Sequence, residues 1–210
     1  MEKGEVHRRQ GEEEVRSGRW DFGDQPALFA VAHAIVKNDQ EAIRAAAKAL
    51  PDLQAPGRDG TTLLYFAVTQ SWQRPELVES VKTLLSLGAD PNYTNGHRDS
   101  FALANAVHGS ARLLQSMLDA GGNPNARDEF GRPIILMNWY LGYYENDQRA
   151  RLDLLLDRGA DPNRAAPDRV TFAKMLTEHQ RHFTAGKRRT PEFETLWKWA
   201  QTHRILAQPE

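Results

Sequence analysis

The sequence predicts an all-α fold, a helical solenoid of about five stacked helix–loop–helix repeats with protruding hairpin-like loops. Two observations predict it. A five-residue motif (glycine, a small residue, Asp or Asn, proline, asparagine) recurs at Gly88, Gly121 and Gly159, with spacings of 33 and 38 residues. Apolar residues also recur at constant offsets from this motif. A period of roughly 20–50 residues is typical of repeat proteins, in which each unit buries its apolar face against its neighbours.

The second helix of each repeat is predicted from an apolar stripe ahead of the motif. An apolar residue stands at the same position of each repeat, and we call this set of positions the first column. The residues three and four positions after it are apolar as well, as on one face of an amphipathic helix. Stepping back 38 residues from Gly88 reaches Leu50, which indicates a degenerate first copy. The first column comprises Ile43, Val81, Leu114 and Leu152.

The first helix of each repeat is predicted from a second set of equivalent positions, one in each repeat, which form another column. In every repeat, three of the four residues that follow this position are apolar. This column comprises Thr62, Ser100, Pro133 and Thr171. A hydroxyl side chain can accept from the free N–H groups of a helix start, and proline tolerates the first turn. The motif glycine suits a left-handed cap at the end of the second helix, and the proline after it starts an extended turn.

The segment DGTTLLYFAV at 59–68 resembles the D-G-x-T-P-L-H-x-A signature of the ankyrin repeat, with Leu63 and Tyr65 in place of the proline and histidine. The GADPN segments resemble the GAD-x-N of that family. The third and fourth copies depart from it, because Asn105 and Asn138 stand where an inward alanine is expected, and buried amides need partners. The resemblance implies one repeat domain over 25–208, with repeats at about 25–57, 58–92, 93–125, 126–163 and 164–208.

The two ends of the chain depart from the plain repeat. Residues 1–24 are charged and predicted to be largely disordered, apart from Trp20 and Phe22, which we expect to dock on the first repeat. The last repeat is predicted as helices at 171–182 and 191–205, and the packing face of the second is predicted as Phe193, Leu196, Trp197 and Ala200.

The repeats of 38 residues contain five extra residues each, near 70–75 and 141–149, between their first and second helices. Such insertions commonly lie on one face of a solenoid, often the binding face. The aromatic residues in and beside them are therefore candidates for contact with a partner.

Composition argues against several classes of function. The net charge is −1 and no cysteine is present, so the sequence offers no global attraction to nucleic acid and no thiolate chemistry. No signal-peptide core or membrane span is evident, so a cytoplasmic location is the default. His179 and His182 lie three apart on a predicted helix without a third metal ligand, and no catalytic motif occurs, so we expect neither an enzyme nor a cofactor or metal site.

The resemblance implies binding of another protein through the hairpin tips and the concave surface of the first helices. Arginine and large aromatic side chains are the usual anchors of such interfaces. The candidate binding residues on the tips and insertions are Trp72, Tyr93, His97, Arg98, Glu129, Phe130, Trp139, Tyr140, Tyr143 and Tyr144.

The preferred hypothesis is a non-catalytic, monomeric protein–protein interaction scaffold. One alternative is an inhibitor or immunity-type protein that occludes a partner enzyme. A second is a targeting module of a larger effector. A third is weak nucleic-acid binding through the basic cluster Lys187–Arg189, which a steep salt dependence of binding would reveal.

Overall fold

The structure, a computed structural model, describes residues 13–98, 101–140, 147–184 and 191–205. Of residues 139–140, 181–184 and 191–193 only the backbone is described. Within these ranges the chain is helical, without a β-strand, and Arg127 and Pro133 form an isolated antiparallel bridge. The chain divides into two compact units, Met1–Gly122 (the N-terminal unit) and Asn123–Glu210 (the C-terminal unit).

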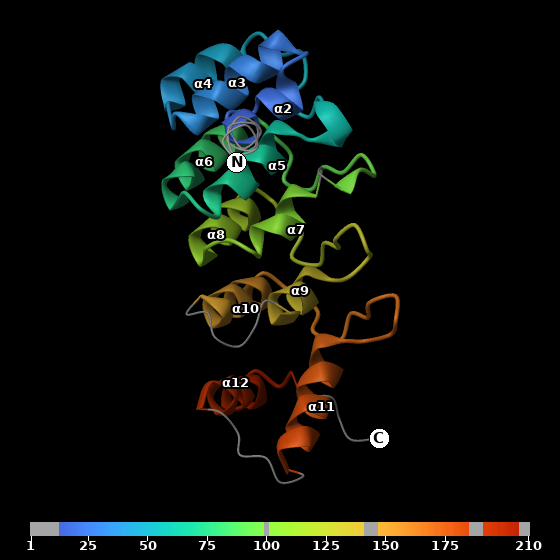
Figure 1. Cartoon of the computed structure of the whole chain (residues 1–210). Coiled ribbons are helices and arrows are strands. Elements are labelled where there is room, and N and C mark those ends of the chain that lie inside the picture. Colours follow the sequence, from blue (N-terminus) through green and yellow to red (C-terminus); the bar gives the residue numbers. More distant parts are fainter. Residues whose placement is uncertain (1–12, 99–100, 141–146, 185–190, 206–210) are drawn as a thin grey trace, which may run out of the picture. The chain divides into compact units, whose positions relative to one another are not determined.

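The N-terminal unit consists of three helix pairs preceded by a short helical segment. Each first helix contacts the next first helix, and each second helix contacts the next second helix, as Figure 1 shows for α3, α5 and α7 and for α4, α6 and α8. This is the predicted stacking of repeats. The pairs are α3 (Pro26–Val36) with α4 (Gln40–Ala47), α5 (Leu63–Ser71) with α6 (Val78–Ser86), and α7 (Ala102–Ala106) with α8 (Ala111–Asp119); two 3-10 turns, η1 (Arg58–Gly60) and η2 (Pro75–Leu77), precede α5 and α6.

In the described part of the C-terminal unit, α9 (Ile134–Tyr140) pairs with α10 (Gln148–Asp157), and α11 (Phe172–Thr184) contacts α9. The last helix is α12 (Pro191–Thr202). The predicted packing face of α12 needs one correction. Trp199 is buried and its indole N–H donates to Asp153 of α10, whereas Trp197 is only half-buried. Leu196, Trp199 and Ala200 have the i, i+3, i+4 spacing of one helix face, and Trp197, three residues before Ala200, lies at the edge of that face. The side chain of Phe193 lies outside the described residues.

The predicted helix ends are confirmed where the structure describes them. The hydroxyl oxygens of Thr62 and Thr171 each accept from the backbone N–H three residues later, at 3.1 Å and 3.0 Å. Ser100, predicted for the same position, lies outside the described residues. The glycine that ends each second helix is left-handed, with φ of 99° at Gly88, 91° at Gly121 and 88° at Gly159. In that region a side chain would be strained, which explains why the motif requires glycine.

The asparagine that ends the motif links each repeat to the next. The side-chain amide of Asn92 donates to the carbonyl oxygen of Gly121 at 2.9 Å, and that of Asn125 donates to Gly159 at the same distance. These carbonyls belong to the glycine that follows a second helix, two residues after the last helical residue, where the helix offers no internal donor. The motif therefore encodes a cap for the following repeat as well as a turn in its own.

The degenerate first copy keeps part of this linkage through a glutamine. The Oδ1 atom of Asn125 accepts from the backbone N–H of Asp161 at 2.8 Å. In the N-terminal unit, Oε1 of Gln54 accepts in the same way from the N–H of Asp90, at 3.1 Å. Gln54 precedes Asn92 by 38 residues and so occupies the asparagine column of the first repeat, which supports the register deduced from Leu50.

Replacing Asn92 with alanine is expected to lower the free energy of unfolding by about 1 kcal/mol, because the side-chain bond to the next helix end is lost. Urea denaturation followed by circular dichroism measures this. Asn163 is a matched control, since it holds the same column and its side chain makes no hydrogen bond within the described part of the chain. An equal effect of Asn163→Ala would contradict the assignment.

The N-terminal extension differs from the prediction of a largely disordered tail over 1–24. Residues 13–16 and α2 (Arg19–Phe22) are helical, and residues 1–12 lie outside the described part. Phe22 is 1% exposed and meets the ring of Phe66 edge-on, with 5.6 Å between ring centroids. The expected docking of Phe22 is therefore present, and it anchors a longer ordered segment than the charge pattern indicated.

Candidate protein-binding surfaces

The hairpin-like loop before α9 presents an exposed aromatic side chain. Phe130 is 57% exposed, the highest value among the large apolar side chains that the structure describes as exposed. The loop is organised by Asp128, which is 3% exposed. Its Oδ1 accepts from the backbone N–H groups of Phe130 (3.0 Å) and Arg132 (2.7 Å), and its Oδ2 accepts from Nε of Arg132 at 2.6 Å. A buried carboxylate thus fixes the backbone on both sides of the exposed ring.

The same loop is held by its neighbours. The guanidinium of Arg132 lies 4.9 Å from the centroid of the Phe130 ring, in cation–π geometry. Arg127 donates to the carbonyl oxygen of Gly131 and, at 3.0 Å, to that of Ala165 in the next loop. Phe130 therefore stands on a preformed tip, with the predicted candidate Glu129 half-exposed beside it.

Three of the candidates in the N-terminal unit lie on its second hairpin-like loop. His97 and Arg98 are exposed and Tyr93 is half-buried. His97 also packs on the preceding loop, because a Cβ atom added to Gly60 would lie 2.3 Å from its own Cβ. His97 therefore contributes to the packing of its loop on the preceding loop.

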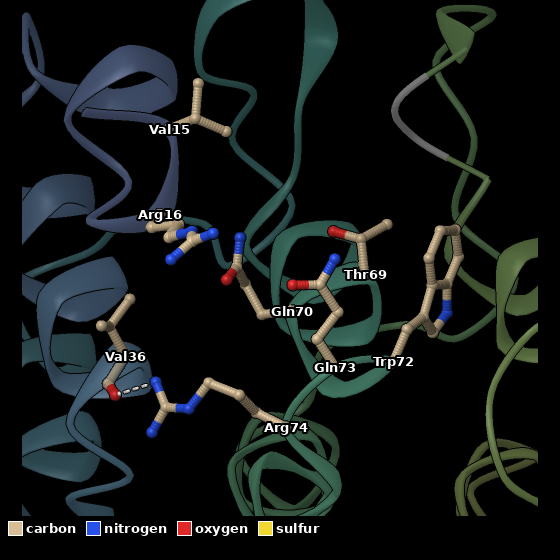
Figure 2. Close-up of a pocket in the computed structure, with 8 residues that line it drawn as sticks. All are labelled: Val15, Arg16, Val36, Thr69, Gln70, Trp72, Gln73 and Arg74. Atoms are coloured by element: carbon tan, nitrogen blue, oxygen red, sulfur yellow. Dashed lines mark hydrogen bonds between the residues drawn. The ribbon is translucent and has the colours of Figure 1, made fainter. Parts of the chain in front are cut away.

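A cleft lies at the opposite, C-terminal ends of the first helices α3 and α5. It has a volume of about 860 Å³ and is lined from three segments: residues 15–16, the end of α3, and the end of α5 with the loop that follows (Figure 2). Trp72, a predicted site residue, lines this cleft, is 41% exposed and stacks on His108, with 5.4 Å between ring centroids. The contribution of the N-terminal segment to this cleft could not be predicted, because Val15 is a lone apolar residue in a charged stretch.

One wall of the cleft is fixed by Arg74. Its Nη1 donates to the carbonyl oxygen of Val36 at 2.7 Å, the bond drawn dashed in Figure 2, and its Nε donates to Glu76 at 2.9 Å. A backbone hydrogen bond and the one from Arg74 lower the pKa of Glu76, so this carboxylate stays ionised. The loop after α5 is thereby tied to the end of α3.

The N-terminal segment covers the first-helix surface of the first two repeats. A Cβ atom on Gly18 would lie 2.9 Å from that of Ala32 in α3 and 3.2 Å from the ring of Phe66 in α5. Farther along, Asp24 pairs with Arg58 of η1 at 3.3 Å. The ankyrin resemblance implies binding through the surface of the first helices as well as through the loop tips. In the first two repeats the N-terminal segment of the protein itself lies on that helix surface.

Several predicted site residues are not placed. Trp139 and Tyr140 are the last residues of α9, and their side chains are not described. Tyr143, Tyr144 and the basic cluster Lys187–Arg189 lie outside the described residues. The prediction that aromatic residues in and beside the insertions contact a partner therefore stays a prediction, and among these residues the structure describes the side chain of Trp72 alone.

The described residues form neither a cluster of metal-binding side chains nor a membrane-spanning helix. No three His, Asp or Glu side chains in this part of the chain gather as they would around a metal ion. No helix within the same ranges has both the length and the apolar character required to span a bilayer.

Comparison with known proteins identifies the repeat. The family model described as ankyrin repeat matches residues 59–96. An ankyrin repeat protein of Acanthamoeba polyphaga mimivirus is 24% identical over an alignment of 177 residues that covers 74% of this chain and 22% of the viral protein. An ankyrin repeat domain from Acinetobacter baumannii superposes with a TM-score of 0.60 at 26% identity, covering 81% of this chain and 80% of that one. Residues 59–96 thus form an ankyrin repeat, and the chain as a whole resembles ankyrin repeat domains.

The ankyrin repeat domain of Bcl-3, a member of the IkappaB family, is similar as well, with a TM-score of 0.56 and 25% identity over 70% of this chain and 61% of that one. The chain spans about a fifth of the length of the viral relative. Ankyrin repeats are generally protein–protein interaction modules, and the predicted all-α solenoid class is confirmed.

Proposed function

We propose that this ankyrin repeat chain is a non-catalytic module that binds a folded protein partner through the ends of its hairpin-like loops. The observation that carries the proposal is Phe130, a large aromatic side chain exposed on a loop whose backbone is held by the buried carboxylate of Asp128. A preformed loop loses little conformational entropy on binding, and an aromatic side chain removes a large apolar area from water.

The charge of the chain supports a protein partner over a nucleic acid. The net charge is −1, and the described tips combine acidic side chains such as Glu129 with cationic ones such as Arg132. Mixed charge around an aromatic centre is typical of protein interfaces. We place this function in the cytoplasm, because a chain without cysteine needs no oxidising compartment to fold.

Replacing Phe130 with alanine is expected to weaken partner binding at least tenfold, the effect typical of a central aromatic anchor. The intact chain captures partners from a lysate of cells that express it naturally, and the affinity of each purified partner is then measured by calorimetry. Trp20→Ala is the matched control, since Trp20 is another exposed aromatic residue (48%) but lies beneath the guanidinium of Arg58, 4.5 Å from its ring centroid.

The two variants separate the possible outcomes. If a partner binds the Phe130→Ala variant with wild-type affinity, the loop end is not part of the interface. A partner that is lost equally from both variants would indicate that general destabilisation, not the loop, sets the affinity.

A further inference from the structure

Two parts of the chain that the repeat does not require meet at one place in the N-terminal unit. The five extra residues of the second repeat form the loop after α5, which contributes Trp72, Gln73 and Arg74 to the cleft of Figure 2. The N-terminal extension contributes Val15 and Arg16 to the same cleft. A repeat without these additions would have neither wall, so the cleft is a feature of this chain and not of the fold.

The lining of the cleft combines apolar side chains with positive charge. Val15 is 48% and Trp72 41% exposed, and they are two of the four large apolar side chains described as exposed in this structure. Arg16 is exposed and makes no ion pair or hydrogen bond within the described part of the chain. The remaining arginine, Arg74, is held by Val36 and Glu76.

No carboxylate lines the cleft among the described residues. The glutamates next to Val15 turn away from it: Glu13 and Glu14 line a separate cleft of about 490 Å³ with Phe29 and His33. The helical turn at 13–16 therefore directs Glu13 and Glu14 to one cleft and Arg16 to the other.

We propose that this cleft binds a peptide segment of a protein partner in which an aliphatic or aromatic side chain stands next to a carboxylate. One apolar side chain would cover Val15, and another farther along the peptide would reach Trp72 beyond Gln70 and Gln73 (Figure 2). The carboxylate would accept from the guanidinium of Arg16, which can bind both of its oxygens. A volume of about 860 Å³ lies in the range of sites that bury several side chains or a small ligand. This inference rests on the proposed function and adds a second surface, at the other end of the first helices.

The composition of the cleft favours a peptide over a nucleic acid strand. A strand needs a row of cationic groups that track successive phosphates, whereas only Arg16 is uncommitted in this lining. The single guanidinium of Arg16 beside Val15 matches a single carboxylate next to an apolar residue (Figure 2).

The test uses the intact chain and a phage library of random dodecapeptides. Enriched peptides are synthesised with a fluorophore and their affinities measured by fluorescence anisotropy for the wild type and four variants. Arg16→Glu and Trp72→Ala change the cleft. Lys48→Glu is the matched charge control on the exposed end of α4, and Phe130→Ala is the control for the loop proposed above.

We expect the enriched peptides to place Asp or Glu next to an apolar residue. Arg16→Glu and Trp72→Ala should each weaken their binding at least tenfold, whereas Lys48→Glu and Phe130→Ala should leave it unchanged. Arg16 is exposed, so Arg16→Glu tests the charge without disturbing the fold, which the melting temperature verifies.

Three results would overturn the proposal: no enriched peptide, enriched peptides that are basic, or enriched peptides that bind both cleft variants as tightly as the wild type. Tighter cleft-dependent binding of a twelve-residue oligothymidylate would reassign the site to nucleic acid. Because Phe130→Ala tests the loop surface separately, failure of the cleft leaves the proposed function standing, and failure of the loop leaves the cleft standing.

Discussion

Replacing Asn138 with alanine is expected to lower the free energy of unfolding by about 3 kcal/mol or more. Asn138 is fully buried, and its amide donates to the carbonyl oxygen of Gln148 at 3.0 Å. Its Oδ1 accepts at 2.9 Å from Nε of Arg151, which is only 1% exposed. Alanine would remove an acceptor from a buried guanidinium and a donor from a buried carbonyl, and each such loss costs more than an ordinary hydrogen bond.

Asn105 provides a matched control for this prediction, because it occupies the same repeat column. It is half-buried, and its amide donates to the carbonyl of Phe101 in its own turn at 2.9 Å. Asn105→Ala should therefore cost less than about 1 kcal/mol. Urea denaturation of both variants measures the difference. If the two variants are destabilised equally, the network with Arg151 contributes nothing specific.

Replacing Phe22 with alanine is expected to cost about 3 kcal/mol or more of unfolding free energy, because a fully buried ring leaves a cavity beside Phe66. The loss should also release the contact of the extension with the loop at Gly57, where an added Cβ would lie 2.6 Å from the Phe22 ring. Hydrogen exchange of residues 13–24 should then accelerate together with the drop in stability.

Trp20→Ala is the control, since Trp20 lies two residues away on the same short helix and is 48% exposed. Its loss removes a cation–π contact with Arg58 worth about 0.5–1 kcal/mol. Should Phe22→Ala prove as mild as Trp20→Ala, the extension would be an appendage and not part of the core of the N-terminal unit.

The repeat architecture was predictable because its determinants are local and recur. Gly88, Gly121 and Gly159 are constrained by a left-handed backbone, and Thr62 and Thr171 by free N–H groups three residues ahead. Such constraints act within a few residues, so they leave a visible column in the sequence. The need of Asn138 for partners was predictable for the same reason, but Gln148 and Arg151 as those partners were not, because they belong to the next helix.

The N-terminal extension and α12 show where sequence patterns are insufficient. The charge of residues 1–24 indicates disorder, but one buried ring, Phe22, and one close approach at Gly18 order residues 13–24. In α12 the choice between Trp197 and Trp199 depends on Asp153, a partner 46 residues away from Trp199. Contacts at such separations have no period to reveal them.

The candidate sites likewise have some features that could be predicted from the sequence and others that could not. Phe130 and Trp72 were predictable as aromatic residues without an evident place in the apolar columns, and both are exposed. The support of Phe130 by Asp128 and the contribution of Arg16 to the cleft were not predictable. The first requires the folded geometry of a loop, and the second comes from outside the repeats.

The hydrogen bond between the Gln54 side chain and the backbone N–H of Asp90 shows which residues the first repeat can use at this position. A side chain one methylene longer than asparagine still delivers its carboxamide oxygen to the following repeat. The requirement at this position is therefore a terminal carboxamide within reach of the neighbouring repeat, which glutamine supplies at position 54 and asparagine at position 125.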